Sequence, residues 1–129
     1  MGVVYNSNYL IWFEIGRVEL MRDLGCSYRE FEEQGYILPV AEANCRFKDS
    51  AAYDDEILIR TRILRLRRSL IQFDYHLYRA GDLKLLATGT TSHFVTGQDK
   101  LRRPMSDGFM DLFERAVVKR VESKATSCT

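Results

Sequence analysis

The segment from Tyr9 to Leu24 constrains the fold more than any other part of this chain. It contains no proline, and Asn6-Ser7-Asn8 before it offers residues typical of a helix N-cap. Its first half, Tyr9–Phe13, is apolar all round a helix, whereas a surface helix keeps a polar face. Charged residues return in the second half, and Gly25 supplies a stop. The sequence therefore predicts a long helix that needs apolar cover on all sides.

The next part of the chain changes from a helical period to a period of two. A capping box, Ser27-Tyr-Arg-Glu30, opens a short helix that Gly35 ends. Alternating apolar and polar residues then predict strands near 41–48, 57–63, 71–77 and 83–96, the first with one face in water. Short turns join the last three, which indicates an antiparallel meander. Within the last strand, Gly89 indicates a bulge or a close backbone approach.

The C-terminal part predicts one more helix and then a loose end. Ser106 or Asp107 caps this helix, and the tail from 122 to 129 is expected to fray. The expected architecture is α+β: a single curved antiparallel sheet wrapped round the long helix. One small sheet does not cover that helix completely, so we expect a second copy of the chain to supply the rest, in a homodimer or homotetramer.

Composition limits the possible classes of protein. The 129 residues suit one domain, covering 1–129. The net charge is +1, from 19 basic and 18 acidic residues, which argues against a nucleic-acid partner. Three cysteines without CxxC spacing fit neither a disulfide framework nor a zinc site and favour the cytoplasm. No apolar run reaches the roughly 20 residues that cross a bilayer, so membrane insertion is not expected.

Several motifs carry a resemblance that covers the chain from Gly2 to about Pro104. They are Gly2-Val-Val-Tyr-Asn-Ser-Asn-Tyr9, Phe13-Glu14 with Arg17, Leu38-Pro-Val-Ala-Glu-Ala-Asn-Cys-Arg46, Tyr53-Asp-Asp55, and Ala87-Thr-Gly89 with His93. Their order and spacing resemble the 4-hydroxybenzoyl-CoA thioesterase family of hot-dog acyl-CoA hydrolases, especially the branch found beside the Tol-Pal genes of bacteria. The resemblance implies the hot-dog fold and hydrolysis of an acyl-CoA thioester, with no metal and no cofactor.

The resemblance also implies roles for particular residues. Gly2 is the family's glycine, and the backbone N–H of Asn6 polarises the thioester carbonyl, so these two are the catalytic candidates. Tyr5 and Tyr9 are the corresponding substrate-binding positions at the mouth of the long helix. Independently, the first N–H groups of a helix lack partners and carry partial positive charge, which suits a developing oxyanion. For the CoA phosphates, the best candidates are Arg102 and Arg103 after the last strand.

One part of the family pattern falls outside the sequence. The family's catalytic Asp is expected three residues before Gly2, which is two residues before Met1, together with the first edge strand of the sheet. A late start codon, a truncation and a pseudoenzyme are the three explanations, of which we favour the first two. Two rival functions stay open: a catalytically silent module that binds acyl-CoA or acyl-carrier protein, and a hot-dog dehydratase, for which no hydratase-type histidine motif is evident.

Other polar residues have a structural interpretation beside a chemical one. Glu14 is a conceivable substitute carboxylate, but an ion pair with Arg17 at helical spacing is favoured. The pair Asp54-Asp55 is expected to shape a loop rather than to bind a metal. The two histidines lack ligand spacing and are expected to be packed or at the surface. Five arginines between 60 and 68 are expected to lie on a solvated sheet face, with attraction of CoA phosphates as the alternative.

Overall fold

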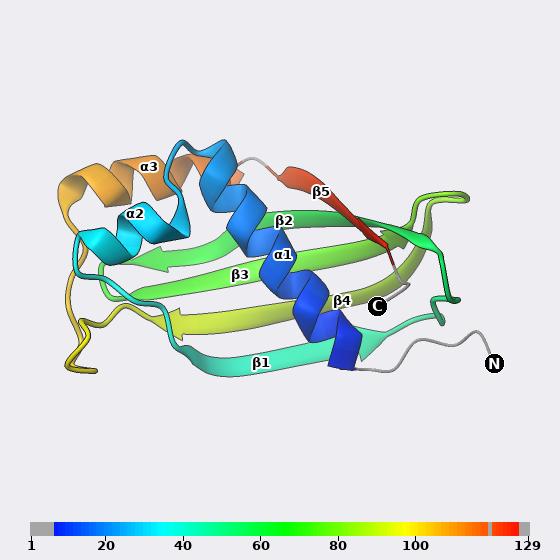
Figure 1. Ribbon diagram of the computed structural model, residues 1–129, viewed down its shortest axis with the longest axis horizontal. Coiled ribbons are helices and arrows are strands. Elements are labelled where there is room, and N and C mark those ends of the chain that lie inside the picture. The colour runs from blue at the N-terminus through cyan, green and yellow to red at the C-terminus, as the bar shows by residue number, and fades with distance from the viewer. Residues whose placement is uncertain (1–6, 119, 127–129) are drawn as a thin grey trace.

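The computed structural model describes residues 7–118 and 120–126, without the side chains of Ser7 and Val118 (Figure 1). Three helices and five strands make up the described chain. In order they are α1 (Ser7–Asp23), α2 (Tyr28–Glu33), β1 (Val40–Phe47), β2 (Glu56–Arg67), β3 (Leu70–Arg79), β4 (Lys84–Phe94), α3 (Asp107–Val118) and β5 (Val121–Thr126). None of these helices is long and apolar enough to span a membrane.

The five strands form one antiparallel sheet in the order β1-β4-β3-β2-β5. The meander of β2, β3 and β4 is thereby confirmed. α1 crosses one face of this sheet diagonally, and α2 and α3 lie together at one end (Figure 1). The predicted α+β arrangement of one sheet against a long N-terminal helix is confirmed. The edge strand expected before Met1 lies outside the sequence and stays a prediction.

The helix boundaries follow the signals in the sequence. Gly25, with φ +88°, ends α1 in a backbone conformation that suits glycine, and Gly35, with φ +90°, does the same after α2. The Ser27 hydroxyl accepts a hydrogen bond from the Glu30 N–H at 3.1 Å, as the capping box predicted. At α3, the Ser106 hydroxyl accepts from the Phe109 N–H at 3.4 Å, which identifies Ser106 as the cap.

The predicted fraying of the tail is wrong for residues 122–126. This segment belongs to β5, which pairs with β2 from Glu56↔Thr126 to Thr61↔Val121. Val121 is buried, and Glu122 and Lys124 form ion pairs with side chains of β2. The segment is held because its alternation matches a sheet edge that is far away in the sequence. Residues 127–129 lie outside the described chain.

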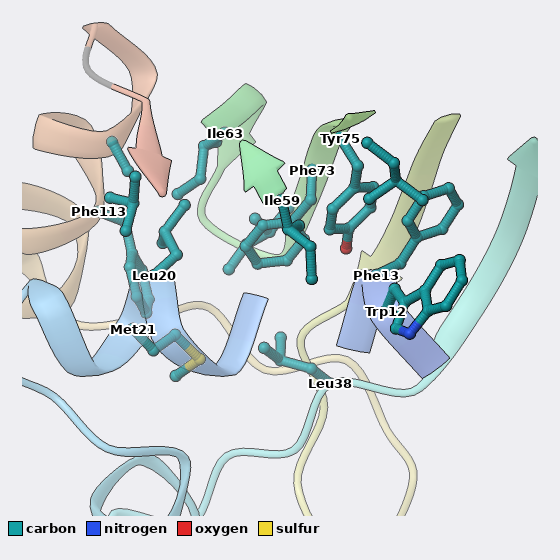
Figure 2. Packing of buried hydrophobic residues seen from close by; sticks show 14 of the residues in the cluster. Trp12, Phe13, Leu20, Met21, Leu38, Ile59, Ile63, Phe73, Tyr75 and Phe113 are labelled. Atoms are coloured by element: carbon teal, nitrogen blue, oxygen red, sulfur yellow. The ribbon is translucent and has the colours of Figure 1, made fainter. Parts of the chain in front are cut away.

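The core lies between α1 and the sheet. Figure 2 shows Trp12 and Phe13 of α1 pointing toward the strands, and the Phe13 ring stacks on Tyr75 of β3. Burial of this helix is confirmed for the residues that face the sheet, but Leu10 and Ile11 are 49% and 50% exposed. A single copy therefore covers only part of the apolar first half of α1, as the sequence suggested.

The prediction for β1 needs correction. One face of this strand was expected to be dry, but in a single copy both faces are exposed and only Cys45 is half-buried. The reason is position, because β1 is an edge strand and α1 packs mainly against β2 and β5 on the other side of the sheet. Gly89 marks a close approach and not a bulge: a Cβ there would stand 2.5 Å from the Asn44 carbonyl oxygen and from the Phe13 ring. The register shifts of the sheet lie elsewhere.

Candidate active site

The mouth of α1 is the expected active site, and the structure describes only part of it. Gly2, Tyr5 and Asn6 lie outside the described residues, so their roles stay predictions. α1 begins at Ser7, directly after the motif that contains Asn6, which is consistent with a helix N-terminus at the expected position. The first backbone N–H groups of a helix have no partners within it and can stabilise negative charge.

Tyr9 is a buried residue of the first turn of α1. Its side chain is only 2% exposed, and its ring packs edge-on against Trp12 and against Phe47 of β1, with centroids 4.9 and 4.8 Å away. Burial is the main cause that raises the pKa of the Tyr9 phenol above its ordinary range. The structure therefore places Tyr9 at the junction of α1 and β1, as a packed apolar wall and not as an exposed polar group.

A chain of hydrogen bonds runs beneath α1 and was not predicted. The Tyr75 and Thr91 hydroxyls are 2.6 Å apart, the Thr91 hydroxyl is 2.8 Å from His93 Nε2, and His93 Nδ1 is 3.1 Å from the Leu38 carbonyl oxygen. At the other end, the Arg17 guanidinium hydrogen-bonds to the Tyr75 hydroxyl. These side chains come from α1, β3 and β4, so the chain links the helix to the sheet.

The direction of every bond in this chain is fixed by its ends. A carbonyl oxygen only accepts, so His93 Nδ1 carries the proton and Nε2 of the neutral ring accepts from Thr91. Thr91 then accepts from Tyr75, which accepts from Arg17, a group that only donates. Burial lowers the pKa of His93 to about 4, although the hydrogen bond to the Leu38 carbonyl opposes this shift. The imidazole is therefore neutral near pH 7, and its two hydrogen bonds stabilise the fold.

The two arginines expected to hold CoA phosphates are placed differently. Both follow β4, at the end of the sheet away from the first turn of α1 (Figure 1). The Arg102 guanidinium lies 3.9 Å from the centroid of the Phe94 ring. Arg103 donates a hydrogen bond to the Gly35 carbonyl oxygen at 2.9 Å and lies over the Tyr36 ring. Within one copy, the structure does not bring either arginine together with Tyr9.

The acidic candidates have clear positions. Asp55 accepts a hydrogen bond from the Ala52 N–H at 2.7 Å and pairs with Arg79 at 3.3 Å, so its predicted role in shaping the loop is confirmed. The predicted ion pair of Glu14 with Arg17 is absent from the described part of the chain. Arg17 turns inward to Tyr75 instead, which leaves Glu14 exposed on α1.

The outer face of the sheet carries the remaining charged candidates. Arg60 pairs with Glu122 at 2.8 Å and Arg62 with Asp74 at 3.2 Å, so the predicted solvated face with balancing acids is confirmed for these two arginines. His76 lies beside Asp74 there, and burial is the main cause that lowers its pKa. Among residues 7–118 and 120–126, no group of His, Cys, Asp and Glu side chains is arranged to hold a metal ion.

Hollows of the described surface lie away from the first turn of α1. One, of about 390 Å³, lies between α2 and α3, where Cys26, Glu30 and Phe109 line it. Another, of about 340 Å³, lies on the outer face of the sheet beside Arg46 and His76.

Burial raises the pKa of the Cys45 thiol to about 11, so this cysteine is a poor nucleophile near neutral pH.

The sheet, the long buried helix and the helix N-terminus at an open sheet edge together define a hot-dog α+β domain. Comparison with known families gives the particular group: the chain belongs to the thioesterase-like superfamily, whose profile matches residues 1–121.

Relatives and solved structures agree with this assignment. The chain is 34% identical over 103 residues to the protein named "Putative acyl-CoA thioesterase YneP" from Bacillus subtilis (strain 168), covering 79% of this chain and 73% of the relative. The crystal structure of hypothetical protein TT1821 from Thermus thermophilus has a TM-score of 0.83 at 28% identity, covering 90% of this chain and 88% of that one. The DHNA-CoA thioesterase from Staphylococcus aureus has a TM-score of 0.78 at 29% identity, covering 90% and 77%.

Proposed function

We propose that this protein hydrolyses an acyl-CoA thioester to a free acid and CoA. The observation that carries the proposal is membership of the thioesterase-like superfamily over residues 1–121. The similarity to a Bacillus subtilis protein named as an acyl-CoA thioesterase points to the same chemistry. The motif resemblance to the Tol-Pal-associated branch and the expected cytoplasmic location belong to this proposal and rest on the sequence alone.

The proposed mechanism uses the helix N-terminus as an oxyanion site. The Asn6 N–H donates to the carbonyl oxygen as negative charge develops there, next to the family's glycine, Gly2. The family Asp, expected two residues upstream of Met1, attacks the carbonyl carbon or removes a proton from the attacking water. The thioester C–S bond breaks, the CoA sulfur takes a proton, and the water oxygen ends in the carboxylic acid. Metal and redox cofactors have no step in this scheme.

Substrate binding divides between the acyl group and CoA. Tyr5 and Tyr9 would line the binding site of the acyl group. The buried Tyr9 ring, which packs against Phe47, supports an apolar lining there. Arg102 and Arg103 would hold CoA phosphates. Because both lie at the other end of the sheet within one copy, this role requires a homo-oligomer in which a second copy brings its own arginines to the mouth.

The test measures CoA release from a panel of short, long and aromatic acyl-CoAs with a thiol-detecting dye. The chain as printed is compared with a version extended by the family's strand and Asp, and with the same version carrying Asn in place of that Asp. We expect the extended version to be active and the Asn change to remove most of the gain, about 100- to 10,000-fold.

Two other outcomes would contradict the mechanism or the function. If the printed chain is as active as the extended one, the carboxylate lies inside it, and Glu14→Gln becomes the decisive variant. If no version releases CoA but acyl-CoA raises the melting temperature of each, the protein is the silent binding module.

A further inference from the structure

The outer face of the sheet, which α1 does not cover, carries a hollow that the proposed hydrolysis does not use. Its volume is about 340 Å³, at the small end of the range of ligand pockets, about 300–1,000 Å³. Polar side chains of β1, β3 and β4 line it. They are Asn44, Arg46, Asp74, His76, Thr88 and Thr90. The hollow therefore suits a small polar ligand and not an acyl chain.

The register of the strands sets these side chains in two adjacent rows that run from β1 through β4 to β3. One row is Arg46, Thr88 and His76, and the other is Asn44, Thr90 and Asp74. Neighbouring strands are about 4.8 Å apart, so the backbones of Arg46 and His76 are roughly 10 Å apart, with Thr88 between them. A compact group held over Thr88 can therefore contact the side chains on both sides.

Positive charge is in excess around this hollow. One oxygen of Asp74, Oδ2, lies 3.2 Å from Arg62 Nε and 3.3 Å from Arg120 Nη1, so two guanidinium groups share one carboxylate. Arg46 forms no ion pair within residues 7–118 and 120–126. Three guanidinium charges against one carboxylate leave an excess of two positive charges. The nearest acid along β1, Glu42, stands four residues from Arg46, roughly 13 Å away.

The two threonines add hydrogen-bond donors to this charge. Asn44 Nδ2 donates to the Thr90 hydroxyl at 2.7 Å, so this hydroxyl keeps its own proton for another acceptor. The Thr88 side chain is half-buried and makes no hydrogen bond to any described residue. Guanidinium and hydroxyl groups are typical donors to phosphoryl oxygens. A phosphate monoester carries a charge of about −1.5 to −2 at pH 7, which matches the positive excess.

We propose that this hollow binds a phosphoryl dianion over Thr88, between Arg46 and His76. The phosphoryl oxygens accept hydrogen bonds from the Arg46 guanidinium and from the Thr88 and Thr90 hydroxyls, and the His76 ring lies beside them. The carboxylate of Asp74 stays paired with its two arginines, which offset its repulsion of the anion. Inorganic phosphate and a nucleoside monophosphate both carry this group. The proposal does not depend on the proposed hydrolysis, which uses the first turn of α1.

Titration with inorganic phosphate, followed by NMR of the histidine rings, tests the site. The chain has two histidines, so His76 reports on the hollow and the buried His93 is an internal reference. At constant ionic strength, phosphate should shift the His76 signals in a saturable way in the millimolar range. The His93 signals should stay unchanged.

The pKa of His76 gives a second measurement on the same sample. Burial is the main cause that lowers this pKa. The charged or titratable groups that face the ring are Asp74 and Tyr78 of β3, Arg60 and Arg62 of β2, Arg46 of β1 across Thr88, and Arg120 before β5. A dianion bound beside the ring favours the protonated form, so saturating phosphate should raise the pKa of His76 by about 0.5 or more.

Matched substitutions separate a specific site from general attraction of anions. Arg46→Gln should weaken phosphate binding about tenfold or more, because it removes a charged donor. Arg29→Gln removes the same charge from the exposed face of α2 and should leave binding unchanged. Thr88→Val keeps the shape of the side chain and should weaken binding about fivefold through the loss of one hydrogen bond. Circular dichroism checks that each variant is folded.

Adenosine 5′-monophosphate distinguishes the two sources of the phosphoryl group. Binding about tenfold tighter than that of phosphate assigns the site to a nucleotide, and equal binding assigns it to free phosphate. The proposal is overturned if chloride at the same ionic strength moves the His76 signals as phosphate does, or if phosphate moves neither ring. It is also overturned if Arg46→Gln and Arg29→Gln bind phosphate equally well. None of these measurements uses CoA release, so their failure is distinguishable from failure of the proposed function.

Discussion

Acid should destabilise this protein through one buried histidine. His93 is fully buried, and its Nε2 accepts a hydrogen bond from Thr91 while Nδ1–H donates to the Leu38 carbonyl oxygen. Protonation removes the acceptor and places a charge in a buried site, where the charge of the Arg17 guanidinium of α1 also disfavours it. The fold therefore favours the neutral ring.

The size of the effect follows from the two pKa values. The pKa of His93 is about 4 in the fold, against an ordinary value of 6.5. Each pKa unit is worth about 1.4 kcal/mol, so the neutral ring contributes about 3 kcal/mol of stability. Because the folded pKa is the lower one, this contribution is fully present above pH 6.5 and is lost as the pH falls to 4. About 2 kcal/mol should be gone by pH 5.

Urea unfolding at fixed protein concentration, followed by fluorescence of the single Trp12, measures this loss. His93→Gln should be less stable at pH 7.5 but should lose about 2 kcal/mol less than the parent between pH 7.5 and 5. His76→Gln, at a partly exposed site where burial also lowers the pKa, is the comparison variant and should recover less of this loss than His93→Gln. The reasoning is refuted if the parent and His93→Gln lose the same stability over this range. An NMR titration of the His93 ring with a midpoint near 6.5 would refute it as well.

Three further predictions concern packing, phosphate binding and capping. Gly89→Ala should destabilise the fold by about 1–3 kcal/mol in urea unfolding, because the new methyl group meets backbone and an aromatic ring, whereas Gly81→Ala, with open space, should be near neutral. Arg102→Ala should raise the KM for acyl-CoA and leave the KM for a CoA-free thioester unchanged. Arg103→Ala should have the same effect and should also lower the free energy of unfolding by about 1 kcal/mol, because it removes the hydrogen bond to the Gly35 carbonyl. Ser27→Ala should lower the free energy of unfolding by about 1 kcal/mol.

Local signals in the sequence predicted the elements well. The helix ends depend on interactions between residues that are close in the sequence, so they can be predicted from local sequence. These are the caps at Ser27 and Ser106 and the stops at Gly25 and Gly35. β5 was missed because its evidence is not local: Val-Glu-Ser-Lys-Ala-Thr has weak strand propensity, and its ion-pair partners lie more than 60 residues away on β2.

The polar chain beneath α1 was missed for a related reason. Tyr75, Thr91 and His93 stand at inward positions of strands that alternate regularly, a pattern that signals burial but not bonding. Which polar groups meet there depends on the register of β3 against β4, and a shift by one residue would turn them outward. The expected Glu14–Arg17 pair failed likewise, because helical spacing permits the contact but a buried phenol competes for the guanidinium.

The position of α1 on the sheet is fixed by contacts that leave it little freedom to slide. Phe13 rests on Gly89, where no Cβ fits, and stacks on Tyr75 with centroids 4.4 Å apart. One turn further along, Gly16 lets the helix backbone approach Thr61 so closely that a Cβ would collide with its hydroxyl. Arg17 then adds its bond to the buried polar chain. Because these contacts tie α1 to β2, β3 and β4, its first turn keeps a constant position relative to the β1 edge. The proposed site, whose oxyanion donor would come from one copy and whose phosphate contacts would come from another, needs that rigidity.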